Sequence, residues 1–178
     1  MSHPSISWSV EAFPANGKGS IRTTTTRRLG LTNVFFCGWL LHQELAEVLN
    51  IADVFVAPSE NEPFGLVFLE AMASGAPVIA SRSGGPLSFV VADGDNANGW
   101  FCEEDGPVSL TRVIIESISN QADRRRRGRN ARAAVVTNYG WSRVAERFED
   151  VYQRMTRRLV PRGSRPQAEP RTKATRLG

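Results

Sequence analysis

Apolar residues along the chain form short runs, and each run is followed by a longer segment with a different spacing. The runs lie at 34–37, 53–57, 77–81 and 99–102, and none of them alternates regularly with polar residues. Short apolar runs without alternation are typical of strands buried on both faces of a parallel sheet. The sequence therefore predicts four such strands.

The segments between and after these runs repeat their apolar residues with the period of a helix. Helices are predicted at 42–51, 64–74, 108–119, 123–137 and 141–158, with a short helix through Val91 after the turn at 83–86. Strands and helices in alternation predict an α/β fold, a Rossmann-like parallel sheet with helices on both faces. Such sheets bind ligands beyond the carboxyl ends of their strands, so we expect the functional site near Gly38, 58–66 and 81–86.

Three regions of the chain differ in character. Residues 1–32 sustain no period and are expected to be an irregular remnant of the start of a domain, while 33–158 form one ligand-binding domain. Residues 159–178 are rich in Pro and Arg and are expected to be a disordered basic tail. Within that tail, 159–164 spell LVPRGS, identical to a common thrombin-cleavage linker, and this stretch carries no weight in the fold prediction.

Charge is distributed unevenly along the 178 residues. The net charge is +4, but residues 1–119 carry 6 Lys and Arg against 13 Asp and Glu, whereas residues 120–178 carry 16 against 5. The predicted site lies in the acidic part of the chain. It is therefore not expected to hold a ligand by bulk positive charge.

The densest basic cluster comprises Arg124–Arg127, Arg129 and Arg132 on a predicted helix. The simplest interpretation is a solvated helix face with Asp123 at its start. Binding of nucleic acid or of an anionic membrane surface are the alternatives. No aromatic residues interleave with the arginines, which argues against base stacking and hence against nucleic acid.

Several classes of protein are excluded by what the sequence lacks. No basic segment followed by an apolar run opens the chain, and no apolar run is long enough to span a bilayer. Cys37 and Cys102 are too few for a disulfide scaffold and have no zinc-ligand spacing. A cytoplasmic protein is expected, with peripheral contact to a membrane as an open alternative.

The predicted helix at 64–74 contains one charged residue, Glu70, among apolar neighbours. A helix apolar on all sides is buried, and a buried carboxylate is costly unless it is paired. One interpretation is an ion pair with Arg82 or Arg112, and the other is a role in binding a ligand.

Gly65 begins this helix and Glu62 precedes it by about one turn. The free backbone N–H groups of Gly65, Leu66 and Val67 would form an anion site without Lys or Arg. Glu62 and Glu70 should lie about 12 Å apart along the helix axis. Carboxylates accept hydrogen bonds from paired hydroxyls, so this pattern predicts a ligand with two polyol ends and an anionic middle.

Asp93-Gly94-Asp95 spells a DxD sequence that elsewhere binds metal. Glycine and asparagine flank the two carboxylates, which is typical of a turn. A turn is therefore the preferred interpretation, and no metal is expected.

Ordered motifs from 34 to 101 resemble the C-terminal, donor-binding domain of glycosyltransferase family 4, the retaining enzymes of the GT-B fold. The matching pieces are the run ending at Gly38, ADVFVAPS at 52–59, EPFG at 62–65, LEAMA at 69–73, GAPVIA at 75–80, GG at 84–85, DG at 93–94 with Gly99, and NAR from 130 onwards. The resemblance covers about residues 29 to 155.

The resemblance implies a role for each matching position. Glu62 would be the catalytic residue that faces the transferred sugar, and Glu70 would accept hydrogen bonds from the ribose hydroxyls. The amides of Gly65, Leu66 and Val67 would hold the diphosphate of a UDP- or GDP-linked sugar. Phe64, within the EPFG motif, is a further implied donor-binding residue. The backbone at Leu40 would contact the nucleobase.

The chain departs from the family pattern in three places. First, no counterpart of the family's acceptor domain precedes the donor domain. Second, the Arg and Lys that neutralise the diphosphate in the family have no counterpart here. Third, Ser88 lies near the position where many members have a Glu after the Gly-Gly turn. The expected function is therefore an NDP-sugar donor domain for retaining transfer to an unidentified acceptor. The alternative is a truncated or split module, inactive alone and completed by a partner acceptor domain.

Overall fold

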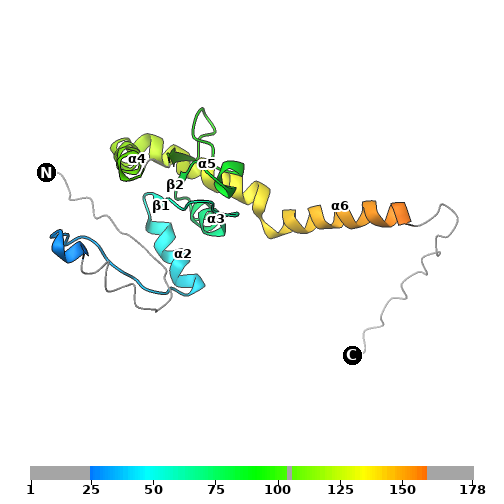
Figure 1. The fold of residues 1–178 in the computed structure, drawn as a ribbon. Coiled ribbons are helices and arrows are strands. Elements are labelled where there is room, and N and C mark those ends of the chain that lie inside the picture. Colours follow the sequence, from blue (N-terminus) through cyan, green and yellow to red (C-terminus); the bar gives the residue numbers. More distant parts are fainter. Residues whose placement is uncertain (1–24, 104–105, 160–178) are drawn as a thin grey trace, which may run out of the picture. The chain divides into compact units, whose positions relative to one another are not determined.

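A computed structural model describes residues 25–103 and 106–159 of the chain (Figure 1). Its elements are, in chain order, α2 (His42–Ile51), β1 (Phe55–Ala57), α3 (Leu66–Ala73), β2 (Val78–Ser81), the 3-10 helix η1 (Gly85–Ser88), β3 (Gly99–Cys102), α4 (Pro107–Ser119), α5 (Gln121–Tyr139) and α6 (Trp141–Leu159). A single helical turn at 25–28 precedes them. The rest of the predicted irregular segment and all but the first residue of the predicted tail lie outside the described residues.

The predicted alternation of strand and helix is confirmed. The bounds of α2 and β3 agree with the sequence prediction at both ends, and the other helices begin or end within three residues of theirs. Gly75, with a φ of +88°, follows α3 as the predicted stop signal. The short helix expected after the turn at 83–86 is η1.

The sheet contains three parallel strands in the order β1-β2-β3. Ile79 in the central strand is paired with Val56 on one side and with Trp100 on the other. The carboxyl ends of β1 and β2 therefore meet at one edge of the sheet, where the loops at 58–65 and 82–85 begin.

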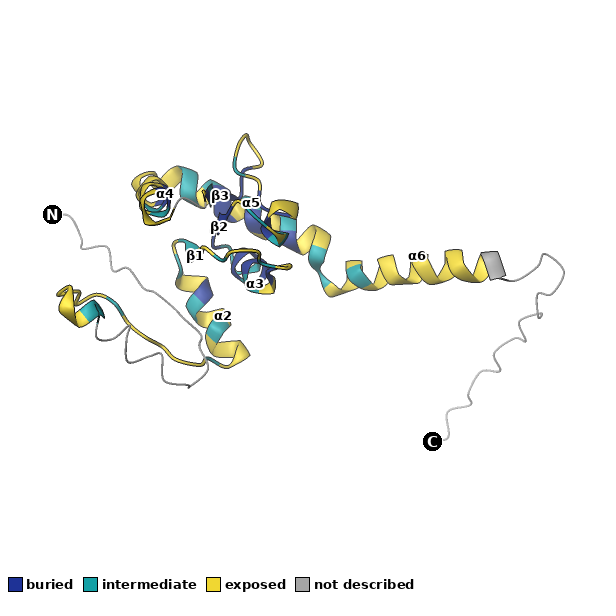
Figure 2. Ribbon diagram, in the orientation of Figure 1, coloured by how far each residue is buried: buried dark blue, intermediate teal, exposed yellow. Residues whose placement is uncertain are grey.

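Helices cover both faces of this sheet. On one face Ile79, Trp100 and Cys102 pack against Val113 of α4, and all four are buried. On the other face the ring of Phe68 in α3 meets Phe55 edge-on, with 5.5 Å between centroids. Figure 2 shows this interior as dark ribbon around β2, β3 and α3. The predicted α/β fold with a parallel sheet between helices is confirmed.

The prediction of a strand at 34–37 is wrong. This run has no strand pairing in the described structure, and Phe35 and Phe36 are 44% and 43% exposed rather than buried. An apolar run becomes a strand only where a neighbouring strand offers its backbone groups. The run does not pair with β1, whose second edge has no partner among the described residues, and it therefore forms no strand.

The described chain forms two compact units, which meet between Thr137 and Asn138. The predicted domain limits at 33 and 158 do not coincide with this division and stay predictions. In the second unit, α6 places Phe148 and Tyr152 one turn apart with their rings stacked at 6.5 Å. No helix in the described ranges is long and apolar enough to cross a membrane.

Arginines of α5 hold the loop between η1 and β3 in place. The buried Arg127 donates hydrogen bonds to the carbonyl oxygens of Ala92 and Gly99, both at 2.6 Å, and its guanidinium lies 4.4 Å from the ring centre of Trp100. Asp123 accepts a further bond from Arg127 at 2.8 Å. One side chain therefore joins a helix, a loop and the edge strand of the sheet.

Other arginines of the predicted basic cluster also bind carbonyl or carboxylate groups within the fold. Arg124 binds Asp53 and the last carbonyls of α4, Arg126 binds the carbonyls of Gly94 and Asp95, and Arg132 binds the carbonyl of Ala73 at the end of α3. Cations at helix C-termini satisfy carbonyl groups that lack helical partners. The interpretation of this cluster as a solvated helix face is therefore wrong for Arg124, Arg126 and Arg127, which are half-buried or buried, whereas Arg125, Arg129 and Arg132 are exposed.

Asp123 has a lowered pKa. Burial alone would raise the pKa of its carboxyl group, but hydrogen bonds from Arg127 and Arg126, together with their charges, outweigh burial and lower it. A carboxyl group whose pKa is lower in the folded state stabilises the fold above its unfolded pKa. That contribution is lost as the pH falls from about 4 toward the folded value.

We predict that Arg127→Leu lowers the free energy of unfolding by about 3 kcal/mol, because it leaves two carbonyl groups without their donor and removes one of the two arginine partners of Asp123. The exposed Arg129 on the same helix provides the control, and Arg129→Leu should change the value by less than about 0.5 kcal/mol. Urea unfolding at pH 7 and at pH 3 measures both variants. Equal destabilisation by the two, or an Arg127 effect that does not shrink at pH 3, would contradict this assignment.

Candidate functional site

The loop between β1 and α3 ends at Gly65, whose backbone is left-handed with a φ of +90°. A Cβ atom there would approach the ring of Phe68 to 2.7 Å, so only glycine fits. The backbone therefore changes direction sharply at Gly65, immediately before the first residue of α3. In the described structure, the backbone N–H groups of Gly65, Leu66 and Val67 at the start of the helix donate no hydrogen bond, although Gly65 is buried and Val67 is half-buried.

Glu70 lies one turn further along α3, and it is half-buried rather than buried. The prediction of a buried carboxylate is wrong because α3 buries only one of its faces. The buried residues are Phe68, Leu69, Ala71 and Met72, whereas Leu66 is 68% exposed. Helical spacing places Glu70 on the same outer face as Leu66.

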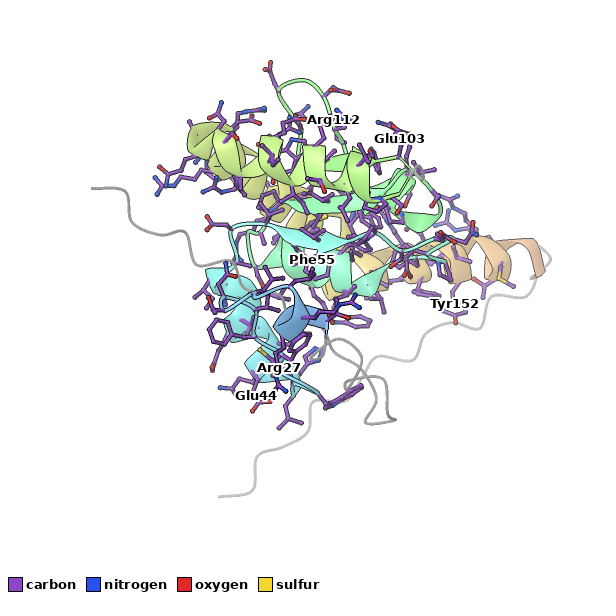
Figure 3. The ribbon with its side chains drawn as sticks, turned by 60° about the vertical axis from the view of Figure 1, so that its left-hand side comes forward. Arg27, Glu44, Phe55, Glu103, Arg112 and Tyr152 are labelled. Carbon is purple, nitrogen blue, oxygen red and sulfur yellow. The ribbon has the colours of Figure 1, made fainter. Side chains whose placement is uncertain are left out.

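The ion pair considered for Glu70 is absent from the described structure. Arg82 binds Glu103 instead, at 2.8 Å. Arg112 lies on α4, across the sheet from α3 (Figure 3). The Glu70 carboxylate thus has no charged partner among the described residues, which leaves it available to a ligand.

A two-glycine turn after β2 packs directly against the loop that carries Glu62. The N–H of Gly85 donates to the carbonyl oxygen of Glu62 at 2.7 Å. A Cβ atom on Gly84 would lie 2.3 Å from that same oxygen, and one on Gly85 would lie 2.4 Å from the Cα of Phe64. The absence of side chains at both positions is what lets the two loops meet.

The two loops together line a shallow cavity of about 610 Å³ that is widely open to solvent. A cavity of this size is within the range of small-molecule sites. Its lining comprises Asn61, Glu62, Pro63, Phe64, Gly84, Gly85, Leu87 and Ser88. No lysine or arginine is among them, as the acidic balance of this part of the chain led us to expect.

Two of the predicted site residues, Glu62 and Phe64, line this cavity. The amides of Gly65, Leu66 and Val67 follow directly in the chain, and Glu70 lies one helical turn beyond Leu66, but none of them is in the cavity lining. Leu40 is half-buried and precedes α2, also outside the cavity. The proposed roles of these residues remain predictions.

Asn61, Leu87 and Ser88 line the cavity and were not predicted as site residues. A signal for Leu87 and Ser88 was present, since the sequence placed the site partly at 81–86, next to them. Asn61 lies within the expected stretch 58–66, but no motif distinguished it from the other polar residues of that loop. Its φ of +53° becomes visible only in the structure.

A second hollow, of about 510 Å³, lies on the outer surface of α4. It is lined by Pro107, Val108, Thr111, Arg112 and Ile115. This lining offers no carboxylate, histidine or thiol, so it lacks the groups that general acid–base or nucleophilic chemistry needs. The cavity beside Glu62 is the better candidate.

Asp93-Gly94-Asp95 lies in a bend that leads into a turn, as the sequence predicted. Its carbonyl groups accept hydrogen bonds from Arg126 and Asn130, and both aspartate side chains are exposed. Within residues 25–103 and 106–159, no group of three His, Cys, Asp or Glu side chains could hold a metal ion. The expectation that the site works without a metal stays a prediction.

Comparison with known proteins relates the chain to enzymes that transfer sugars. D-inositol 3-phosphate glycosyltransferase of Corynebacterium diphtheriae is 37% identical over 128 residues, which are 71% of this chain and 29% of that protein. The structure of sucrose-phosphate synthase from Thermosynechococcus elongatus superposes with a TM-score of 0.73 at 29% identity, and the match covers 85% of this chain and 38% of that one. The chain thus spans less than a third of this curated relative.

A further structure shares the fold at lower identity. HepE from Anabaena, solved in complex with UDP and glucose, superposes with a TM-score of 0.67 at 23% identity over 76% of this chain and 36% of its own. The family model described as "Glycosyl transferases group 1" matches residues 20–134. That match covers the sheet, α2 to α4, both loops of the cavity and most of α5. The chain therefore belongs to the glycosyl transferases of group 1.

Proposed function

We propose that this chain binds a nucleotide-sugar, linked to UDP or GDP, as the donor for glycosyl transfer with retention of configuration. The observation that carries the proposal is the set of unpaired amides at Gly65, Leu66 and Val67, which lie in the sequence between the carboxylates of Glu62 and Glu70. Such amides suit a diphosphate. The cavity supplies no cationic side chain that could take their place.

The two carboxylates bind the two ends of this ligand, the ribose and the transferred sugar. Glu70 accepts hydrogen bonds from the 2′- and 3′-hydroxyls of the ribose, a role that suits a carboxylate without a protein partner. The backbone at Leu40 meets the nucleobase. At the other end Glu62, in the cavity with Phe64, faces the transferred sugar.

In the reaction that we propose, the bond between the anomeric carbon and the diphosphate oxygen breaks and an acceptor hydroxyl bonds to the same face of that carbon. The acceptor's proton passes to the leaving diphosphate, so no side-chain nucleophile is required. Glu62 supports the positive charge that develops near the anomeric carbon. No metal takes part in this scheme.

The family and the shared fold support this proposal. HepE was solved with UDP and glucose, the two parts of a nucleotide-sugar. The chain, however, spans 29% of the first curated relative. We therefore propose as a second candidate that it is a split or truncated module, which binds donor but needs an acceptor domain from a partner chain to turn over.

The role of Glu70 predicts a loss of nucleotide affinity. Glu70→Ala should weaken UDP and GDP binding by about 10- to 100-fold, because a hydrogen bond to a charged group is lost. The variant should also lose most of the wild-type preference for UDP over 2′-deoxy-UDP. Isothermal titration calorimetry measures all of these affinities.

The matched control is Glu47→Gln, a change of an exposed glutamate on α2, which should leave the affinities unchanged. A wild-type chain that binds UDP, GDP and their sugar conjugates no better than it binds free phosphate would refute the donor site itself.

The glycine turn predicts a separable effect. Gly84→Ala should abolish detectable donor binding, since the added methyl group would push the carbonyl of Glu62 away. Gly94→Ala is a matched control, because Gly94 has a similarly positive φ of +79° but nothing within 4 Å of a Cβ atom. Gly94→Ala should lose about 1 kcal/mol of stability from backbone strain, and Gly84→Ala should lose more, because its methyl group also clashes with the carbonyl of Glu62. Donor titration beside thermal unfolding tests this, and equal donor affinity in the two variants would contradict it.

The two candidate functions differ in turnover. The full chain, incubated with its best-binding nucleotide-sugar and a panel of soluble hydroxyl acceptors, should release no nucleoside diphosphate above background if an acceptor domain is missing, because transfer requires an acceptor held against the donor. Release that depends on acceptor and is lost in Glu62→Gln would reject the split-module candidate. It would leave donor binding in place.

A further inference from the structure

Asn61 is the one residue other than glycine that has a positive φ, +53°, among residues 25–103 and 106–159. Asparagine tolerates this left-handed conformation better than most residues, but glycine would serve the backbone alone equally well. Asn61 follows the exposed Glu60 and comes directly before Glu62. A residue in this conformation at the edge of a cavity points to a function.

The side chain of Asn61 is available to a ligand. It is exposed and lines the cavity beside Glu62, and no described residue makes a hydrogen bond to its carboxamide group. The bond between Gly85 and the carbonyl of Glu62 fixes the next residue of the loop. The position of Asn61 at the cavity is therefore set by the fold and not by contacts of its own side chain.

The polar side chains of the cavity differ in whether they can donate a hydrogen bond to a ligand. The carboxylate of Glu62 offers two oxygens that accept hydrogen bonds. Ser88 directs its hydroxyl proton to the carbonyl oxygen of Gly85, at 2.7 Å. Among the side chains of the lining, Asn61 alone has N–H donors that no protein group uses.

We propose that the carboxamide of Asn61 binds the transferred sugar, donating a hydrogen bond to one of its hydroxyl oxygens while Glu62 accepts from a neighbouring hydroxyl. This inference rests on the proposed donor function. It assigns the recognition of the sugar, as distinct from the nucleotide, to a residue pair in which one member donates and the other accepts. A sugar that lacks one of the two hydroxyls leaves a member of the pair without its partner, and this makes Asn61 a specificity-determining residue.

Two substitutions isolate the side chain from the backbone. Asn61→Gly keeps the left-handed conformation and removes the carboxamide, and Asn61→Asp keeps the shape but replaces the donor with an acceptor. Calorimetry of the full chain with UDP, GDP, UDP-glucose, UDP-N-acetylglucosamine and GDP-mannose provides the readout. Glu60→Gln, a change of an exposed neighbour outside the cavity lining, is the matched control.

Both Asn61 variants should bind UDP and GDP within twofold of wild type, and should bind the best wild-type sugar conjugate about tenfold more weakly. Glu60→Gln should change neither. Unchanged affinity of Asn61→Gly for the sugar conjugate would overturn this inference and leave the proposed function intact, and so would an equal loss for the free nucleotide. A wild-type chain that binds none of the five ligands would instead overturn the proposed function, and this inference with it.

Discussion

The contact between two loops, made by the N–H of Gly85 and the carbonyl of Glu62, is the constraint on which the candidate site depends. It joins the carboxyl end of β2 to the loop that follows β1, and thereby fixes the backbone from Asn61 to Phe64. The cavity, the position of Glu62 and the entry into α3 at Gly65 all follow from it. Two adjacent glycines make this contact possible because a side chain on either would occupy the space of the other loop.

Some polar groups of the described chain bind other groups of the protein, and others have no protein partner and can bind a ligand. The arginines of α5 are largely committed to carbonyls and carboxylates within the fold, and Arg127 is buried against Trp100. At the candidate site, the groups without a protein partner include the backbone amides at the start of α3, the carboxylates of Glu62 and Glu70, and the carboxamide of Asn61. A nucleotide-sugar would thus be held by helix-terminal amides and by hydrogen bonds to hydroxyls, in a region whose net charge is negative.

The sequence was sufficient to predict the elements whose local pattern agrees with their packing. The bounds of α2 and β3 were predicted to the residue, and the turn at Gly84 and Gly85 was placed at the ligand-binding edge of the sheet. Predictions were wrong where the strand pairing, burial or hydrogen-bond partners of a residue depend on residues far away in the sequence. The run at 34–37 is apolar but pairs with no strand in the described structure. Glu70 lies on an outer face of its helix that composition did not reveal, and four arginines of α5 bind groups that are far away in the sequence.

The most direct test of the account is to locate the diphosphate by NMR. In a titration of the ¹⁵N-labelled full chain with UDP, the largest amide shifts should fall on Gly65, Leu66 and Val67, and Glu70→Ala should weaken the titration without moving it elsewhere. Shifts that are concentrated on α5 between Arg124 and Arg132, with the amides of 65–67 unmoved, would contradict it. The anion would then be held by arginine side chains and not by the start of α3.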